Sequence, residues 1–215
     1  SEIALAGQKV PFGTDMLFRS TGTVPMTFHV EICEDIWVPV PPSSLAALAG
    51  AEVLVNLSAS NITIGKAELR RLLCGSQSAR CSAAYAYSAS GPGESTTDLA
   101  WDGQAAIFEC GDQLAETERF EKDSTIVQAD IDLGRIRQER LRNGGFADNG
   151  REQGAGVSRF RRIEFELDAP KKGVPLQRAI ERLPSALRVA LVLRVRHQSG
   201  EGTTTLAAAQ RRFGR

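Results

Sequence analysis

The chain has 215 residues, with 26 acidic and 26 basic side chains, so its formal net charge is zero. This balance excludes the strong overall field that draws a protein to nucleic acid or to an anionic membrane. No apolar run approaches the length of a membrane span. The four cysteines (33, 74, 81 and 110) are dispersed without metal-ligand spacing, and we expect no secretory leader. We therefore expect a reduced, cytoplasmic protein without a metal site.

The chain starts abruptly. Ser1 stands where an initiator Met would be, and body-like sequence follows at once. We therefore expect a fragment whose beginning is missing.

The first clear element is a strand over residues 26–32. Apolar residues at positions 26, 28, 30 and 32 alternate with polar ones, which is the period of a strand with one buried face. On this pattern His29 and Glu31 point away from the apolar side, and we expect Glu31 to be solvated or ion-paired.

Cys33 follows this strand directly. Prolines at 39, 41 and 42 prevent a regular ladder from continuing, and Ser43 can cap a short helix that ends near Gly50. A thiol on a strand-to-helix turn is presented outward at a sheet edge, where α/β enzymes place nucleophiles. The alternative is a buried structural cysteine.

Strands and helices alternate through the next fifty residues. We expect strands over 53–57 and 83–87 and a helix over 65–81. The spacing puts Leu69 and Leu72 on the buried face of that helix and Arg70 and Gln77 on the exposed one. The two helical cysteines lie seven positions apart and are expected to face the interior as structural thiols.

A hairpin and a further strand and helix complete this pattern. We expect strands over 106–109 and 114–118 around the turn Gly111-Asp112, then a strand over 124–131 and a helix over 133–141. Residues 142–159 are rich in Gly, Asn and charge, so we expect an exposed loop. Alternating elements of this kind predict an α/β layered domain.

The composition changes near the C-terminal end. From Lys171 onward there are ten basic residues against two acidic ones. We interpret 1–168 as one domain and 169–215 as a basic tail of unclear, non-native origin, such as a frame-shifted end. A nucleic-acid-binding arm is the alternative.

Several motifs occur together in a fixed order. Cys33-Glu34-Asp35 is followed by Val38–Ser43, Asn56–Ser60, Ile62–Lys66 and Gly93–Gln104. Together they resemble the carbon–nitrogen hydrolase (nitrilase) superfamily, and within it the glutaminase domains of bacterial glutamine-dependent NAD synthetases. The resemblance covers roughly residues 5 to 168. It implies a nitrilase-type α-β-β-α sandwich that is truncated at its N-terminus.

The resemblance also implies roles for the catalytic residues. Cys33 would be the nucleophile, while a glutamate acts as general base and acid and a lysine holds the oxyanion. Both normally lie upstream, and the residues before Cys33 contain only Glu2, Lys9 and Glu31, none in a matching context. We expect this chain to carry one of the three catalytic groups.

Four positions align with substrate-binding residues of the family. Glu34 would meet the substrate ammonium through its carboxylate and help the oxyanion through its backbone N–H, and Trp37 would wall the pocket. Ser60 aligns with a pocket serine, with a loop-closing hydroxyl as the alternative. Lys66 stands where an arginine often grips the substrate α-carboxylate, and lysine lacks the bidentate fork. Its alternative is a solvated residue of a helix first turn.

Two acidic features complete the predicted surroundings of Cys33. Asp35 is expected to be structural, bonding backbone N–H groups at the turn. Glu94, Asp98 and Asp102 form an acidic loop that resembles the family segment at the active-site rim.

The function implied by this resemblance is hydrolysis of the glutamine amide. The ammonia would serve a synthetase domain of the same polypeptide, which amidates deamido-NAD with ATP and Mg. No cofactor is expected in this fragment, which would be inactive alone, and no nucleic acid or membrane partner is expected; the intact protein would form a homo-oligomer. The alternatives are a stand-alone amidase of the nitrilase superfamily and a non-catalytic nitrilase-fold fragment.

Overall fold

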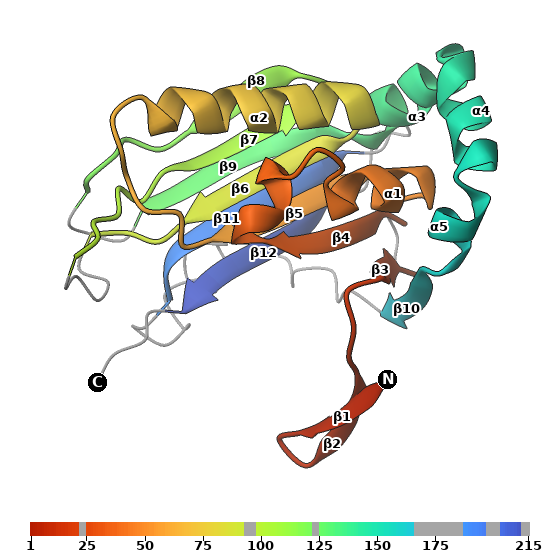
Figure 1. The fold of residues 1–215 in the computed structure, drawn as a ribbon, viewed down its shortest axis with the longest axis horizontal. Helices are drawn as coiled ribbons and strands as arrows, with labels where there is room; N and C mark the ends of the chain where they lie inside the picture. Colours follow the sequence, from red (N-terminus) through yellow and green to blue (C-terminus); the bar gives the residue numbers. More distant parts are fainter. Residues whose placement is uncertain (22–24, 93–97, 122–124, 166–186, 197–202, 212–215) are drawn as a thin grey trace.

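The computed structural model describes residues 1–21, 25–92, 98–121, 125–165, 187–196 and 203–211. Its central element is a seven-stranded mixed sheet (Figure 1). The strands in spatial order are β10 (Arg161–Phe165), β3 (Met16–Ser20), β4 (Thr27–Ile32), β5 (Val53–Ser58), β6 (Ala84–Ala89), β7 (Ala105–Glu109) and β8 (Asp112–Glu116). Strands β4, β5 and β6 run parallel, so their carboxyl ends meet at one edge of the sheet.

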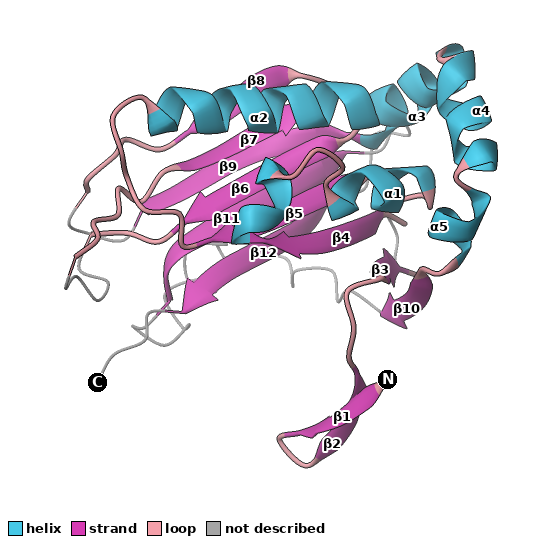
Figure 2. Cartoon of the chain, viewed as in Figure 1, coloured by secondary structure: helices cyan, strands magenta, loops and turns pink. Residues whose placement is uncertain are grey.

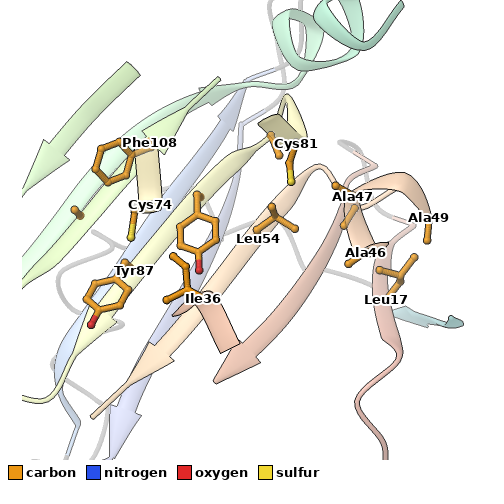
Figure 3. Close-up of a cluster of buried hydrophobic side chains, with 14 of the residues drawn as sticks. Leu17, Ile36, Ala46, Ala47, Ala49, Leu54, Cys74, Cys81, Tyr87 and Phe108 are labelled. Carbon is orange, nitrogen blue, oxygen red and sulfur yellow. The ribbon is translucent and has the colours of Figure 1, made fainter. Parts of the chain in front are cut away.

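Helical elements cover one face of this sheet, as Figure 2 shows. They are the 3-10 helix η1 (Cys33–Trp37) and the α-helices α1 (Pro42–Leu48) and α2 (Lys66–Cys81). Apolar side chains from both layers form the helix-side core, in which Ile36, Leu54, Cys74 and Tyr87 are buried (Figure 3). Burying this face supplies the hydrophobic free energy that holds the helices on the sheet.

A second, three-stranded sheet packs on the opposite face. It is formed by β9 (Thr125–Asp132), β11 (Leu187–Arg196) and β12 (Thr203–Arg211), and β9 leads directly into α3 (Leu133–Arg142). Val55 and Ile107 of the large sheet pack with Val127 and Ile131 of β9 in one buried cluster. The predicted α/β class is therefore confirmed, and the layers follow the order α-β-β, three of the four that the resemblance implies.

The C-terminal segment contributes backbone to this second sheet. Strand β11 pairs in parallel with β9 and antiparallel with β12. The domain boundary expected at 168 lies outside the described residues, and the non-native origin of 169–215 stays a prediction. Glu94 of the acidic loop also lies outside the described residues.

Most predicted elements are confirmed at close to the expected positions: β5, β6, β9, α2 and α3 fall within one or two residues of their predicted ranges. The β7–β8 hairpin is confirmed as well, but its two-residue turn is Cys110-Gly111 rather than Gly111-Asp112. Both turn residues have positive φ, as a type I′ turn requires.

The prediction of an exposed loop over 142–159 is wrong. These residues form α4 (Gly144–Glu152) and α5 (Gly154–Ser158) at the edge of the molecule (Figure 1). Neither helix has a fully buried residue, which explains the loop-like composition. Phe146 and Val157 nevertheless pack against the helix-side core and anchor the two helices.

A short hairpin at the N-terminus extends away from the main body (Figure 1). It consists of β1 (Glu2–Leu5) and β2 (Gln8–Pro11), which pair antiparallel. Glu2 and Lys9, two of the three candidate catalytic residues upstream of Cys33, lie on this exposed hairpin.

The prediction that one face of β4 is exposed is wrong. His29 and Glu31 are buried, while Ile32 is exposed. The reason is that β4 lies inside the sheet with packed layers on both faces, so polar side chains are enclosed as fully as apolar ones.

The start of α1 also differs from the prediction. Ser43 does not cap the helix, because α1 begins one residue earlier at Pro42. Proline suits this first helical position, where its missing N–H would have had no intrahelical partner. The backbone N–H of Ser43 instead donates a hydrogen bond to the Glu31 carboxylate, at 3.0 Å.

The predicted buried face of α2 is wrong in part. Arg70 and Gln77 are buried, whereas Leu69 and Leu72 are exposed. These polar residues of α2 face a buried hydrogen-bonding network. A pattern of apolar residues in the sequence cannot reveal such a network. The interior location of Cys74 and Cys81 is confirmed.

We expect Leu54→Ala to lower the free energy of unfolding by about 2–5 kcal/mol, because it opens a cavity in a fully buried site. Leu72→Ala is the matched control, since its side chain is 66% exposed, and should change stability by no more than about 0.5 kcal/mol. Urea denaturation followed by circular dichroism measures both values. Equal losses in the two variants would contradict the observed orientation of α2.

Candidate functional site

Cys33 lies at the junction between β4 and η1, at the edge where the parallel strands end. Its backbone is in the left-handed region, with φ of +51°, and its side chain is partly exposed. Asp35 stabilises the turn by accepting the Ile32 N–H at 2.7 Å, so its predicted structural role is confirmed. A non-glycine residue in this conformation costs about 1–3 kcal/mol, which the surrounding structure must supply.

Three other left-handed residues have local explanations that Cys33 lacks. Ala6 and Cys110 occupy two-residue hairpin turns, and Ser82 ends helix α2. Such turns and helix ends regularly hold left-handed residues. Cys33 instead sits between a strand and a helix, the arrangement that projects a nucleophile from a sheet.

Strand β5 contacts Cys33 at two points. The side-chain amide of Asn56 donates to the Cys33 carbonyl at 3.4 Å, and the Ser58 hydroxyl donates to Cys33 Sγ at 3.5 Å. Asn56 and Ser58 are alternate residues of one strand, so their side chains share a face. Both are fully buried, which makes this face of β5 a rigid support for the cysteine.

The two helical cysteines are unsuited to act as nucleophiles. Burial raises the pKa of Cys74 well above its ordinary value and that of Cys81 to about 12. Both thiols therefore stay protonated at physiological pH, and a thiol is far less nucleophilic than a thiolate.

The structure brings Trp37 and Lys66 together. Lys66 Nζ lies 5.3 Å from the centre of the Trp37 ring and donates to Asn61 Oδ1 at 3.0 Å. Lys66 begins α2 and is half-buried, so it is not the freely solvated residue of the alternative interpretation. Glu34 is exposed on the same turn as Cys33.

Ser60 occupies the loop between β5 and α2. It is buried, and in the described part of the chain its hydroxyl has no hydrogen-bond partner. Its backbone N–H donates to the Ser58 hydroxyl at 3.2 Å. The alternative role as a loop-closing hydroxyl therefore falls to Ser58 rather than to Ser60.

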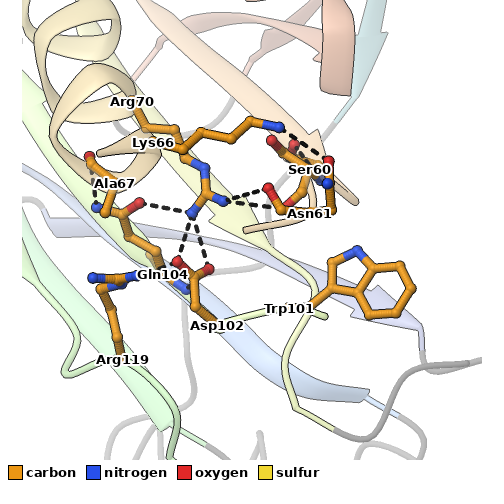
Figure 4. Close-up of polar contacts among 12 residues, drawn as sticks. Ser60, Asn61, Lys66, Ala67, Arg70, Trp101, Asp102, Gln104 and Arg119 are labelled. Carbon is orange, nitrogen blue, oxygen red and sulfur yellow. Dashed lines mark hydrogen bonds and ion pairs between the residues drawn. The ribbon is translucent and has the colours of Figure 1, made fainter. Parts of the chain in front are cut away.

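A buried ion pair holds this loop in place (Figure 4). Arg70 donates to both carboxylate oxygens of Asp102, at 2.9 and 2.8 Å, and the two side chains are 2% and 0% exposed. The same guanidinium donates to the backbone carbonyls of Ser60 and Asn61, each at 3.1 Å. Arg70 thus links the start of α2, the Ser60 loop and the segment that enters β7.

Asp102 was expected at an acidic rim and is instead enclosed. Its carboxylate also accepts from Arg119 at 3.0 Å, so two cations neutralise it. Within the described residues no group of three His, Cys, Asp or Glu side chains is arranged to hold a metal ion. Likewise, no helix in the described ranges combines the length and apolar character needed to cross a bilayer.

The expectation that Glu31 is solvated or ion-paired is wrong. Its carboxylate is 2% exposed and accepts hydrogen bonds from the Tyr85 hydroxyl and the Ser43 N–H. Among the residues that the structure describes, no carboxylate and no ammonium group is hydrogen-bonded to Cys33 Sγ. The described chain therefore supplies the thiol without a bonded general base.

The comparisons with known proteins point to one group of enzymes. Over 182 residues, 85% of its length, the chain is 56% identical to the glutamine-dependent NAD(+) synthetases of Mycobacterium leprae and Mycobacterium tuberculosis. The chain matches a part of the glutamine-dependent NAD(+) synthetases. The resemblance predicted from the motifs is thereby confirmed. The chain spans 27% of the length of these mycobacterial synthetases.

More distant NAD(+) synthetases match as well. The Saccharomyces cerevisiae enzyme is 30% identical over 166 residues, which is 76% of this chain and 22% of that protein. A crystal structure of a glutamine-dependent NAD(+) synthetase from Cytophaga hutchinsonii is 16% identical with a TM-score of 0.46, covering 94% of this chain and 38% of that one. No family model matches the chain.

Three residues of the site were missed from the sequence. Asn56 and Ser58 stand at alternate positions at the end of the strand next to Cys33, and that spacing is a signal that could have found them. Arg70 gave no such signal, because a basic residue on a helix is usually exposed.

We expect Arg70→Met to lower the free energy of unfolding by about 3–5 kcal/mol, because it leaves the Asp102 charge buried with less compensation. Arg151→Met is the control, since Arg151 pairs with Asp148 on the surface and should contribute less than about 1 kcal/mol. Chemical denaturation measures both. A loss in Arg70→Met no larger than in the control would show that the buried pair does not hold the loop.

Proposed function

We propose that this chain is part of a nitrilase-like glutaminase domain in which Cys33 attacks the side-chain carboxamide of glutamine. The observation that carries the proposal is the placement of Cys33. The thiol lies on a left-handed strand-to-helix turn at the carboxyl edge of parallel strands, within a chain 56% identical to glutamine-dependent NAD(+) synthetases.

The proposed reaction proceeds through a thioester. The thiolate forms a C–S bond to the carboxamide carbon, the C–N bond breaks, and nitrogen leaves as ammonia after gaining a proton. Water then attacks the thioester, releasing glutamate and regenerating the thiol. The general base and acid that move these protons are not among the groups bonded to Cys33 in the described residues.

The residues around Cys33 offer complementary charges for an amino acid. The Lys66 ammonium is suited to the α-carboxylate of glutamine, and the exposed Glu34 carboxylate to its α-ammonium. Trp37 supplies an apolar wall, and Ser60 a hydroxyl that is free of protein partners in the described structure. A lysine gives a point charge rather than a bidentate fork, so carboxylate recognition here relies on charge more than on geometry.

In the longer protein, we propose that the released ammonia reaches a synthetase domain of the same polypeptide. That domain would use ATP and Mg to amidate deamido-NAD. A cytoplasmic location and a homo-oligomeric assembly belong to the same proposal. The identity to the mycobacterial synthetases supports it.

We expect Cys33→Ala in the longer protein to abolish NAD synthesis from glutamine while leaving synthesis from free ammonia intact. The physical reason is that the thiol serves only the amide hydrolysis, at a site separate from the ATP-dependent reaction. The measurement is the rate of NAD formation with each nitrogen source.

Cys110→Ala is the matched control for this experiment. Cys110 is also partly exposed and left-handed, but it lies in a hairpin turn away from the proposed site. The control should retain both activities. Full glutamine-dependent activity in Cys33→Ala would refute the assignment of the nucleophile.

We expect the 215-residue chain alone to release no measurable ammonia from glutamine. Positioned acid–base catalysis commonly contributes about 10²–10⁴-fold, and an oxyanion donor about 10²–10³-fold more. Neither a carboxylate nor an ammonium group is bonded to Cys33 Sγ in the described residues. Ammonia release is compared with that of Cys33→Ser, and turnover near one per second that disappears in this control would contradict the expectation.

A further inference from the structure

Ser58 lies beside Cys33 because of the strand register. Ile32, the last residue of β4, pairs with Leu57 of β5. Cys33, which follows Ile32, and Ser58, which follows Leu57, therefore lie at the same sheet edge. The Ser58 hydroxyl comes within 3.5 Å of Cys33 Sγ. Ser58 is fully buried, so bulk water does not reach its hydroxyl.

The hydroxyl of Ser58 also interacts with the Ser60 backbone and with the Tyr87 side chain. The Ser60 N–H donates to Ser58 Oγ at 3.2 Å and occupies one of its lone pairs. A serine hydroxyl has a single proton, and accepting from Ser60 leaves that proton available to the sulfur. The loop that orients Ser58 is in turn held by Arg70 through the Ser60 carbonyl.

The neighbouring residue of the same face fixes the backbone of the cysteine. Asn56 donates to the Cys33 carbonyl at 3.4 Å, two positions before Ser58. Strand β5 therefore holds both the carbonyl and the sulfur of Cys33.

We propose that Ser58 is a further catalytic residue, whose hydroxyl donates a hydrogen bond to Cys33 Sγ and stabilises the thiolate. The proposal rests on the role of Cys33 as nucleophile. Hydrogen bonds to charged groups are stronger than those to neutral ones, so the contact favours the ionised sulfur. The same bond stabilises the thiolate when it leaves the thioester.

Ser58 transfers no proton in this scheme. Its proton stays on Oγ throughout, the sulfur lone pair forms the new C–S bond, and the departing nitrogen takes its proton from a separate acid. Ser58 changes how readily the thiolate exists and does not replace the general base.

Other titratable groups lie close to this sulfur. Tyr87, on the adjacent strand β6, interacts with the Ser58 side chain and more weakly with Cys33, and burial raises the pKa of Tyr87 to about 12. It therefore stays neutral below pH 10. Glu34 and Asp35 follow on the same turn, and Asp35 is bonded to the Ile32 N–H.

The test is alkylation of the purified 215-residue chain with iodoacetamide, with labelling at each cysteine quantified by mass spectrometry. In this reaction the thiolate displaces iodide, so no glutaminase activity is needed. At pH 7 we expect Ser58→Ala to slow labelling of Cys33 roughly tenfold, the loss of one hydrogen bond to a charged group. Labelling of Cys110 should be unchanged.

The pH dependence separates thiolate stabilisation from a structural effect. Well above the ordinary pKa of a cysteine thiol, alkylation no longer depends on how readily a thiolate forms, so at pH 9.5 the rates of Ser58→Ala and the original chain should converge. A steric or folding defect would slow labelling at both pH values. Ser90→Ala is the matched control, because that hydroxyl donates to the Ser58 carbonyl at 3.4 Å and should leave labelling of Cys33 unchanged.

Unfolding is detected within the same experiment, because Cys74 and Cys81 are buried and become labelled only when the chain opens. If Ser58→Ala unfolds, Ser58→Thr and Ser58→Val repeat the comparison, since they are equal in shape and only Thr keeps a hydroxyl. Cys33 should then react faster in the Thr variant.

Two results would overturn different statements. Labelling of Cys33 at the original rate at pH 7 in a folded Ser58→Ala or Ser58→Val variant refutes the role of Ser58 and leaves the proposed function standing. Failure of Cys33 to react faster than Cys110 in the unaltered chain contradicts the nucleophile assignment itself and, with it, the inference.

Discussion

The parallel register of β4, β5 and β6 is the constraint on which the site depends. Ile32 pairs with Leu57, and Leu57 pairs with Ser88, so all three strands end at one edge. Because side chains alternate along a strand, a slip of one residue would turn Ser58 to the opposite face. Burial on both faces of the sheet makes such a slip costly, since it would exchange the contents of the two cores. The position of the sulfur is therefore set by the packing of the whole sheet.

Buried polar contacts add a second level of order above this register. Arg70 and Asp102 form an ion pair that reaches the carbonyls of the loop after β5, and Glu31 joins β4 to the start of α1 and to Tyr85. A buried polar network is stable only when its members are paired, so it admits few alternative loop positions. A substrate that needs several groups in fixed places benefits from such restriction.

The sequence predicts the elements of this fold better than it predicts their faces. Alternating apolar residues locate β4, and a short continuous apolar run locates β5, because hydrophobic patterns follow backbone geometry. The same periodicity treats every polar residue as exposed, so it misplaces Glu31 and Arg70, whose partners lie far away in the chain. Cys33 could be found from the strand before it and the prolines after it. Ser58 could not be given a role, because its contact with the sulfur depends on pairing between strands that the sequence does not state directly.

The left-handed backbone at Cys33 lowers the stability of the fold but places the thiol for its proposed chemistry. Glycine adopts a φ of +51° without the steric penalty that a Cβ brings, so conformational energy alone favours glycine at this position. Redesign procedures that raise stability commonly relieve strain of this kind, and activity is the recurrent cost. Applied to this chain without knowledge of its chemistry, such a procedure would remove the thiol among its first changes. A protein engineer who does not know the substrate can therefore use an unfavourable backbone conformation at a single residue to recognise that the residue is functional.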